Sequence, residues 1–249
     1  MATLATAPSN CCIKTVEHTG TARGTIEKIA GIDTYIVGTA DPQDSRKIIL
    51  FFADVYGPIF LNSQLIMDYW ASNGYLVLAP DYFEGDAAGK YVGTPGFIMR
   101  DWAKPKMEKA VLMIPPWLKA VREQYDSTNT KWVTVGYCFG APFVMDCVAS
   151  DWISAGALAH PAYLDEGHFR RAKKPLLLSC AEIDHTFPAM NRRRAVDILV
   201  ENKTKYHVQV FSGVTHGFAL RGNVNDPIAR WAKEKSAEGI LSWFDLFIN

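Results

Sequence analysis

The chain has 249 residues, of which 49% are hydrophobic and 12% aromatic, and its 26 basic side chains balance 26 acidic ones. This composition excludes a disordered chain, and the balanced charge provides no overall field that would attract nucleic acid or an anionic membrane surface. The sequence contains neither an apolar run of membrane-spanning length nor the basic and apolar start of a secretory signal, so a cytoplasmic location is the default expectation.

Five cysteines are scattered along the chain without the spacing of a zinc site or of a disulfide framework. They are Cys11, Cys12, Cys138, Cys147 and Cys180. We therefore expect no disulfide and no structural metal. Apart from Cys138, each is expected to serve as a small buried apolar side chain.

Residues 1–24 are rich in Ala, Thr, Gly and Ser and lack periodicity, which predicts an irregular N-terminal arm. No catalytic residue is expected there. Residues 25–249 are predicted to form a single domain. It opens with two short apolar stretches, 25–29 and 34–37, which flank a Gly-containing turn and predict an antiparallel hairpin.

Beyond the hairpin, compact apolar runs alternate with segments of helical length. The runs are typical of strands buried on both faces and occupy residues 47–52, 76–79, 132–135, 155–159, 176–179 and 207–211. The predicted helices occupy residues 63–72, 104–122, 141–149, 189–200 and 228–247. This alternation predicts the α/β class, with a mostly parallel central sheet flanked by helices. Residues 85–97 are loop-like, and either a lid at the edge of a pocket or an ordinary surface connection fits them.

The sequence Gly136-Tyr137-Cys138-Phe139-Gly140 lies directly between a predicted strand and a predicted helix. It has the pattern of a nucleophile elbow, in which a tight turn flanked by glycines projects the central side chain above the carboxyl end of the sheet. The N-terminus of the following helix is expected to favour a thiolate. This context favours Cys138 as a nucleophile over its reading as a buried apolar residue.

A nucleophile needs a base and an acidic group that orients the base. In chains whose nucleophile lies on such an elbow, the acid follows the nucleophile in the sequence and the histidine base follows the acid. Asp184 lies after the strand that ends near Cys180, and His216 follows the last predicted strand. Glu182 and His185 are the alternatives to Asp184. His160, at the end of another strand, is the rival histidine and is expected to line the pocket.

Backbone N–H groups of Phe139 and Val55 are the expected oxyanion donors, because Val55 lies in the loop after the first long buried strand. Asp54, beside Val55, is expected either to face the entrance of the active site or to cap its own turn. Several aromatic side chains are expected near the entrance of the active site. They are consistent with a flat substrate and equally with ordinary packing of the core. They are Tyr56, Tyr82, Phe83, Tyr137 and Phe218.

Taken together, these motifs resemble the dienelactone hydrolase family, also called carboxymethylenebutenolidases, and especially its fungal members. The resemblance spans about residues 25–249. Its matching segments are 52–57, 78–83, 136–141, 159–161 and 216–219, in the order of the family.

The resemblance implies an α/β-hydrolase that cleaves a small lactone or carboxylic ester through an acyl-thioester on Cys138, with His216 passing the proton. It implies no metal and no organic cofactor. In bacterial members a glutamate at the position of Asp54 holds the thiol proton, and arginines bind the substrate carboxylate. Arg221 and Arg100 are the nearest candidates for those arginines.

Two other functions remain open at this stage. The same apparatus suits a thioesterase or a chain-releasing hydrolase of secondary metabolism, and the fold could also serve a ligand-binding protein without catalysis. In each case the expected partner is a small molecule, and the sequence leaves the oligomeric state open.

Overall fold

The computed structural model describes residues 1–13, 15–39 and 46–248 and contains an eight-stranded sheet with the order β10-β9-β7-β6-β4-β5-β3-β2. The strands are β2 (Thr25–Ile29), β3 (Ile32–Val37), β4 (Lys47–Phe52), β5 (Leu76–Pro80), β6 (Lys131–Tyr137), β7 (Ala155–Ala159), β9 (Leu176–Ile183) and β10 (Tyr206–Thr215). Strands β2 and β3 pair antiparallel, as do β3 and β5, whereas every pairing from β5 to β10 is parallel. The α/β class and the opening hairpin are confirmed.

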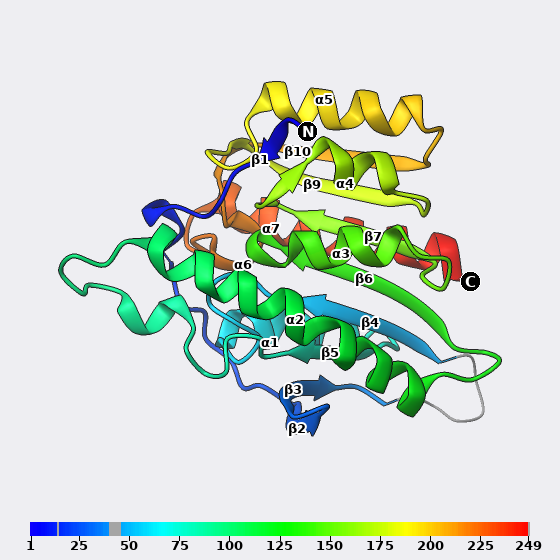
Figure 1. Cartoon of the computed structure of the whole chain (residues 1–249). Coiled ribbons are helices and arrows are strands. Elements are labelled where there is room, and N and C mark those ends of the chain that lie inside the picture. The colour runs from blue at the N-terminus through cyan, green and yellow to red at the C-terminus, as the bar shows by residue number, and fades with distance from the viewer. Residues whose placement is uncertain (14, 40–45, 249) are drawn as a thin grey trace.

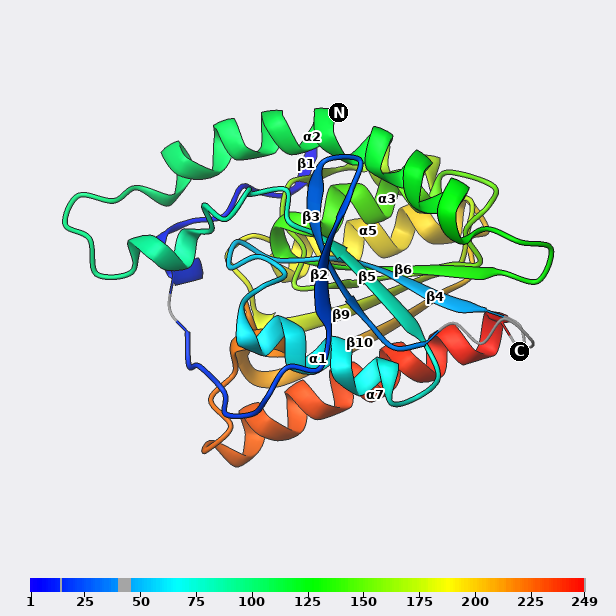
Figure 2. The ribbon, with the colours of Figure 1, turned by 90° about the horizontal axis from the view of Figure 1, so that it is seen from below.

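Helices cover both faces of the sheet. Figure 2 shows α2 (Met99–Tyr125), α3 (Ala141–Val148) and α5 (Ala189–Glu201) on one face, and α1 (Leu61–Ala71) and α7 (Pro227–Ile248) on the other. Two shorter helices, α4 (Glu166–Arg171) and α6 (Phe218–Arg221), pack against α3 and α5 and against α7 respectively. No helix in the described part of the chain is long and apolar enough to cross a bilayer.

Strand β4 shows why the sheet needs a layer of helices on each face. Ile48, Leu50 and Phe52 belong to the core under α2 and α3, while Ile49 and Phe51 belong to the core under α1 and α7. Successive side chains of a strand point to opposite faces, so a continuously apolar strand requires a helical layer on each side.

The helix α2 begins at Met99 and ends at Tyr125, whereas the sequence predicted residues 104–122. It contains Pro105, Pro115 and Pro116, each of which removes a backbone donor. A stripe of side chains along this helix is nevertheless buried, including Ile114 and Trp117. Packing of that stripe on the sheet therefore outweighs the local cost of the prolines.

Residues 1–24, expected to be irregular, contain two ordered pieces. The strand β1 (Thr3–Ala5) pairs antiparallel with β8 (Leu164–Asp165), and a 3-10 turn, η1 (Asn10–Ile13), follows it. The side chain of Asn10 accepts a hydrogen bond of 2.8 Å from the backbone N–H of Met99, at the start of α2. The arm, blue in Figure 1, thus runs from the β8 region to the start of α2.

The loop-like segment 85–97 contains a short 3-10 helix, η2 (Ala88–Tyr91). The rings of Tyr91 and Phe97 stack with centroids 5.0 Å apart, and the backbone N–H of Ala88 donates to the carbonyl of Val55 over 2.9 Å. The segment therefore contacts the loop that follows β4.

Candidate active site

The elbow has the geometry that its glycines predict. Cys138 has φ of 47°, in the left-handed region, directly between β6 and α3. A Cβ on Gly140 would lie 2.3 Å from the carbonyl oxygen of Phe52, and one on Gly136 would lie 2.8 Å from the carbonyl oxygen of Gly140. Any larger residue at either position would collide with backbone, so the tight turn requires both glycines.

His216 and Asp184 are brought together by the loops that follow β10 and β9. Nδ1 of His216 lies 2.9 Å from Oδ1 of Asp184, and the two side chains are 2% and 1% exposed. The same carboxylate oxygen accepts hydrogen bonds from the backbone N–H groups of Thr186, at 2.9 Å, and Phe187, at 3.1 Å. The alternative acid, Glu182, instead binds the hydroxyl of Ser212 and the backbone N–H of Gly213.

The charges of this pair support each other. Burial alone would lower the pKa of His216, but the charge and hydrogen bond of Asp184, with a smaller contribution from Cys12, raise it to about 9. Burial alone would raise the pKa of Asp184, yet the same interaction, together with a hydrogen bond from Thr186, lowers it below its ordinary value. The pair therefore favours an imidazolium beside a carboxylate, with Nδ1 fixed as a donor.

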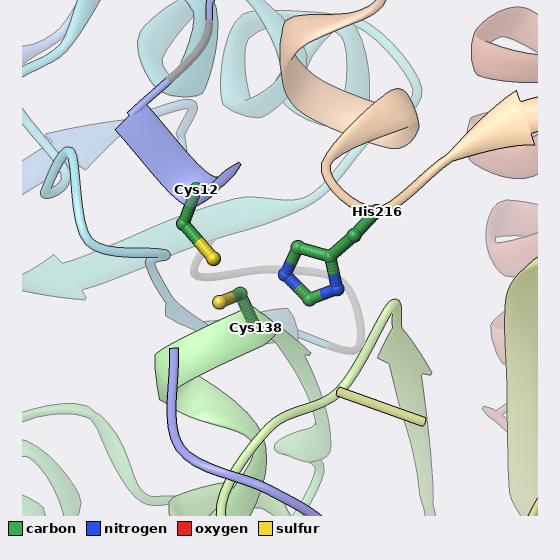
Figure 3. Close-up of side chains that lie close together, drawn as sticks. All are labelled: Cys12, Cys138 and His216. Carbon is green, nitrogen blue, oxygen red and sulfur yellow. The ribbon is translucent and has the colours of Figure 1, made fainter. Parts of the chain in front are cut away.

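Cys12 is the first of two residues of the site that the sequence did not indicate. Its sulfur, the sulfur of Cys138 and a ring nitrogen of His216 all lie within 4.8 Å of one another, although Cys12 comes from the N-terminal arm (Figure 3). Its sulfur also lies 3.6 Å from Nε2 of His185. Cys12 is buried, as expected, but it lies beside Cys138 and His216, which the sequence did not indicate.

The arm also changes the state of the elbow thiol. Burial raises the pKa of Cys138 well above its ordinary value, and the contact with Cys12 raises it further. The hydrogen bond between the two sulfurs correspondingly lowers the pKa of Cys12. Burial and the contact with Cys12 thus oppose the thiolate on Cys138 that the helix N-terminus is expected to favour.

Asp54 and Arg221 form a buried ion pair. Oδ2 of Asp54 lies 2.8 Å from Nε of Arg221, with the side chains 0% and 2% exposed, and Oδ1 accepts from the backbone N–H of Tyr56. The guanidinium also lies 5.1 Å from the centre of the Tyr56 ring and donates to the carbonyl of Cys12. Arg221 therefore anchors the arm, and its charge is already balanced by Asp54. Arg100 is exposed in the first turn of α2.

The other residues that the sequence predicted for the site are buried near Cys138 and His216. The ring of His160 lies 4.8 Å from that of His216 and 5.7 Å from that of Tyr137, and both His160 and Tyr137 are fully buried. Burial lowers the pKa of His160 well below its ordinary value, so the ring is neutral. Val55 and Phe139 are also fully buried, in the loop after β4 and in the elbow itself.

A cleft of ≈ 540 Å³ opens beside the base. Its lining includes His185, His216 and Arg221, together with Thr15 and Val16 of the arm. Cys138 is absent from this lining and is 0% exposed. The cleft reaches the base, whereas η1 covers the nucleophile.

Thr186 was the second residue that sequence reasoning missed. Its hydroxyl lies 2.8 Å from Oδ1 of Asp184 and 3.0 Å from Nδ1 of His216. A threonine two residues after the acid carries no motif of its own, and nothing in the spacing distinguishes it. For Cys12, the only signal was the adjacent pair Cys11-Cys12 in a segment with few large apolar residues.

Known proteins resemble the chain over almost its whole length. It is 35% identical over 244 residues to Dienlactone hydrolase 1 of Gibberella moniliformis, covering 96% of this chain and 93% of the relative. It is 32% identical over 259 residues to hydrolase tropI of Talaromyces stipitatus, covering 99% of each. The structure of a putative dienelactone hydrolase from Klebsiella pneumoniae matches with a TM-score of 0.70 at 15% identity, covering 90% of this chain and 98% of that one.

The family model of the dienelactone hydrolase family matches residues 32–248. This range begins at β3 and includes the elbow, the Asp184 loop and the His216 loop, while the arm that carries Cys12 lies outside it. The family assignment expected from the motifs is therefore confirmed: the chain belongs to the dienelactone hydrolase family and is a carboxylic ester or lactone hydrolase of the α/β-hydrolase fold.

Proposed function

We propose that the protein hydrolyses a small lactone or carboxylic ester through an acyl-thioester on Cys138. The observation that carries this proposal is the hydrogen bond of 2.9 Å between His216 and Asp184, beside a cysteine at the elbow. The pair orients the ring so that Nε2, which is buried and has no hydrogen-bond partner among the described residues, can exchange protons with a thiol.

The reaction divides into two acyl transfers. In its neutral form His216 takes the proton of Cys138, and the sulfur attacks the carbonyl carbon to give a tetrahedral oxyanion that the N–H groups of Phe139 and Val55 stabilise. The bond to the alkoxy oxygen then breaks, and this oxygen receives the proton from His216. In the second transfer, water gives a proton to His216 and attacks the thioester carbon, and the sulfur leaves and recovers the proton.

The residues around the elbow limit the kind of substrate that can bind. The charge of Arg221 is paired with Asp54 at 2.8 Å, so a substrate carboxylate would have to compete with a buried protein carboxylate. We therefore propose that neutral esters and lactones react at least as well as substrates that carry a carboxylate. Because η1 covers Cys138, we also propose that the arm moves aside when substrate enters.

The test is a panel of a dienelactone, a neutral lactone, p-nitrophenyl acetate and an acyl-thioester, each with wild type, Cys138→Ala and Cys147→Ala. Cys147 is buried on α3 and serves as the matched control. Hydrolysis lost in Cys138→Ala and kept in Cys147→Ala supports the proposal. Full activity of Cys138→Ala would contradict it, and turnover of the thioester alone would replace the lactonase assignment with a thioesterase.

A further inference from the structure

Soft metal-binding atoms converge where the arm meets the elbow. The sulfurs of Cys12 and Cys138 and a ring nitrogen of His216 lie within 4.8 Å of one another, and Figure 3 shows the three side chains close together although they come from separate segments. Nε2 of His185 lies 3.6 Å from the Cys12 sulfur. Cysteine sulfur and histidine nitrogen are the ligands that zinc prefers.

The spacing of these atoms fits tetrahedral coordination. With Zn–S bonds of about 2.3 Å and Zn–N bonds of about 2.0–2.1 Å, a tetrahedron places two sulfurs about 3.8 Å apart and a sulfur about 3.6 Å from a nitrogen. The distance of 3.6 Å between Cys12 and His185 already has this value. The separations between the ligand atoms of Cys12, Cys138 and His216, at most 4.8 Å, need to shorten by at most about 1.2 Å.

The hydrogen bonding of His216 gives a second indication. Its Nδ1 is engaged by Asp184 at 2.9 Å, while its Nε2 is buried and has no hydrogen-bond partner among the described residues. The side chain is 2% exposed. A histidine held by a carboxylate through one nitrogen, with the other nitrogen directed at thiols, is the usual arrangement of a histidine that binds zinc.

We propose that Cys12, Cys138 and His216 bind one Zn²⁺ ion, with the fourth position open to His185 or to water. Each thiol and the imidazolium of His216 lose a proton on binding, so affinity rises with pH and protons are released. The metal would join the arm to the elbow and hold η1 over Cys138. Since Cys138 and His216 are also the proposed nucleophile and base, the zinc-bound protein is a resting form without hydrolytic activity, and this last consequence rests on the proposed function.

Metal binding can be measured without reference to catalysis. The full chain is reduced with a phosphine, freed of metal by a chelator and titrated with Co²⁺ in the absence of oxygen. We expect one Co²⁺ per chain, with the sulfur-to-cobalt charge-transfer absorption and the intense visible bands of a tetrahedral thiolate site. Zn²⁺ should then displace Co²⁺, because it binds such ligands more tightly.

The variant Cys12→Ser tests the role of the arm, and Cys147→Ser is its matched control. Loss of a direct ligand should weaken zinc binding by about 10–100-fold or more, since loss of a supporting residue already costs that much. Cys147→Ser should keep the wild-type spectrum and affinity. Far-ultraviolet circular dichroism of metal-free Cys12→Ser shows whether it remains folded. The proposal is overturned if wild type gives no charge-transfer band, or if folded Cys12→Ser gives the same spectrum and affinity as wild type.

Hydrolysis of p-nitrophenyl acetate provides the second readout. One equivalent of Zn²⁺ should abolish wild-type activity, a chelator should restore it, and Cys12→Ser should require at least about tenfold more zinc. Equal inhibition of both proteins would place the metal on the elbow and base alone and overturn the three-residue site. The cobalt spectrum stays informative if Cys138 proves not to be the nucleophile, so failure of the two proposals can be distinguished.

Discussion

The buried pair of Asp54 and Arg221 gives the sharpest prediction for stability. Both side chains are almost completely removed from solvent, and the atoms that carry the interaction are 2.8 Å apart. Removing one member of a buried ion pair leaves the other charge unpaired, which typically costs about 3–5 kcal/mol. For a chain of this size, that loss corresponds to a decrease in Tm of about 6–20 °C.

We therefore expect Arg221→Met and Asp54→Asn each to lower the free energy of unfolding by about 3–5 kcal/mol. In the double variant no charge is left unpaired, so its loss should be smaller than the sum of the two single losses by about 2 kcal/mol or more. Urea denaturation at pH 7, followed by circular dichroism, measures all four proteins. Single losses below about 1 kcal/mol, or strict additivity, would refute the buried-pair account.

Three further predictions concern the base and the elbow. Asp184→Asn should lower the pKa of His216 from about 9, because burial is then opposed only by the smaller contribution of Cys12, and should reduce hydrolysis by at least about 100-fold; NMR titration of the imidazole and steady-state kinetics measure the two effects. In wild type, the folded pKa of His216 lies above the unfolded value of 6.5, so its stabilisation is complete below pH 6.5 and is lost as pH rises through about 9; urea midpoints that rise over this interval would contradict the assignment. Gly140→Ala should cost about 2 kcal/mol or more and impair hydrolysis, because its Cβ would lie 2.3 Å from the carbonyl oxygen of Phe52; unchanged stability and activity would show that the elbow is less tight than described.

Much of the architecture could be predicted because its signals are local. The apolar run of β4 shows burial on both faces, and two glycines around Cys138 allow only a tight turn. Element ends were less predictable, since α2 continues through three prolines where packing on the sheet outweighs local preference. The helix α4 has six residues, too few for periodicity, and begins with a capping box formed by Asp165 and His168.

The cluster around the nucleophile could be predicted only in part. Cys138, Asp184 and His216 each follow a strand, so their meeting at one edge of the sheet follows from topology. Cys12 reaches the same point through a long-range pairing, β1 with β8, and a strand of three residues leaves no pattern in the sequence. Arg221 was expected to bind a substrate carboxylate. Its ion pair with Asp54 joins residues that are 221 − 54 = 167 positions apart, and the sequence gives no sign of such a contact.

The central claim is that Cys138, and not the neighbouring Cys12, carries the acyl group. A direct test identifies which of the two cysteines is acylated. The protein is mixed with p-nitrophenyl acetate, quenched in acid within the first turnover, digested, and its peptides are mapped by mass spectrometry. We predict one acetyl group on the peptide that contains Cys138, absent in Cys138→Ala and retained in Cys12→Ser. Acetylation of Cys12 in wild type, with the peptide containing Cys138 unmodified, would contradict the account.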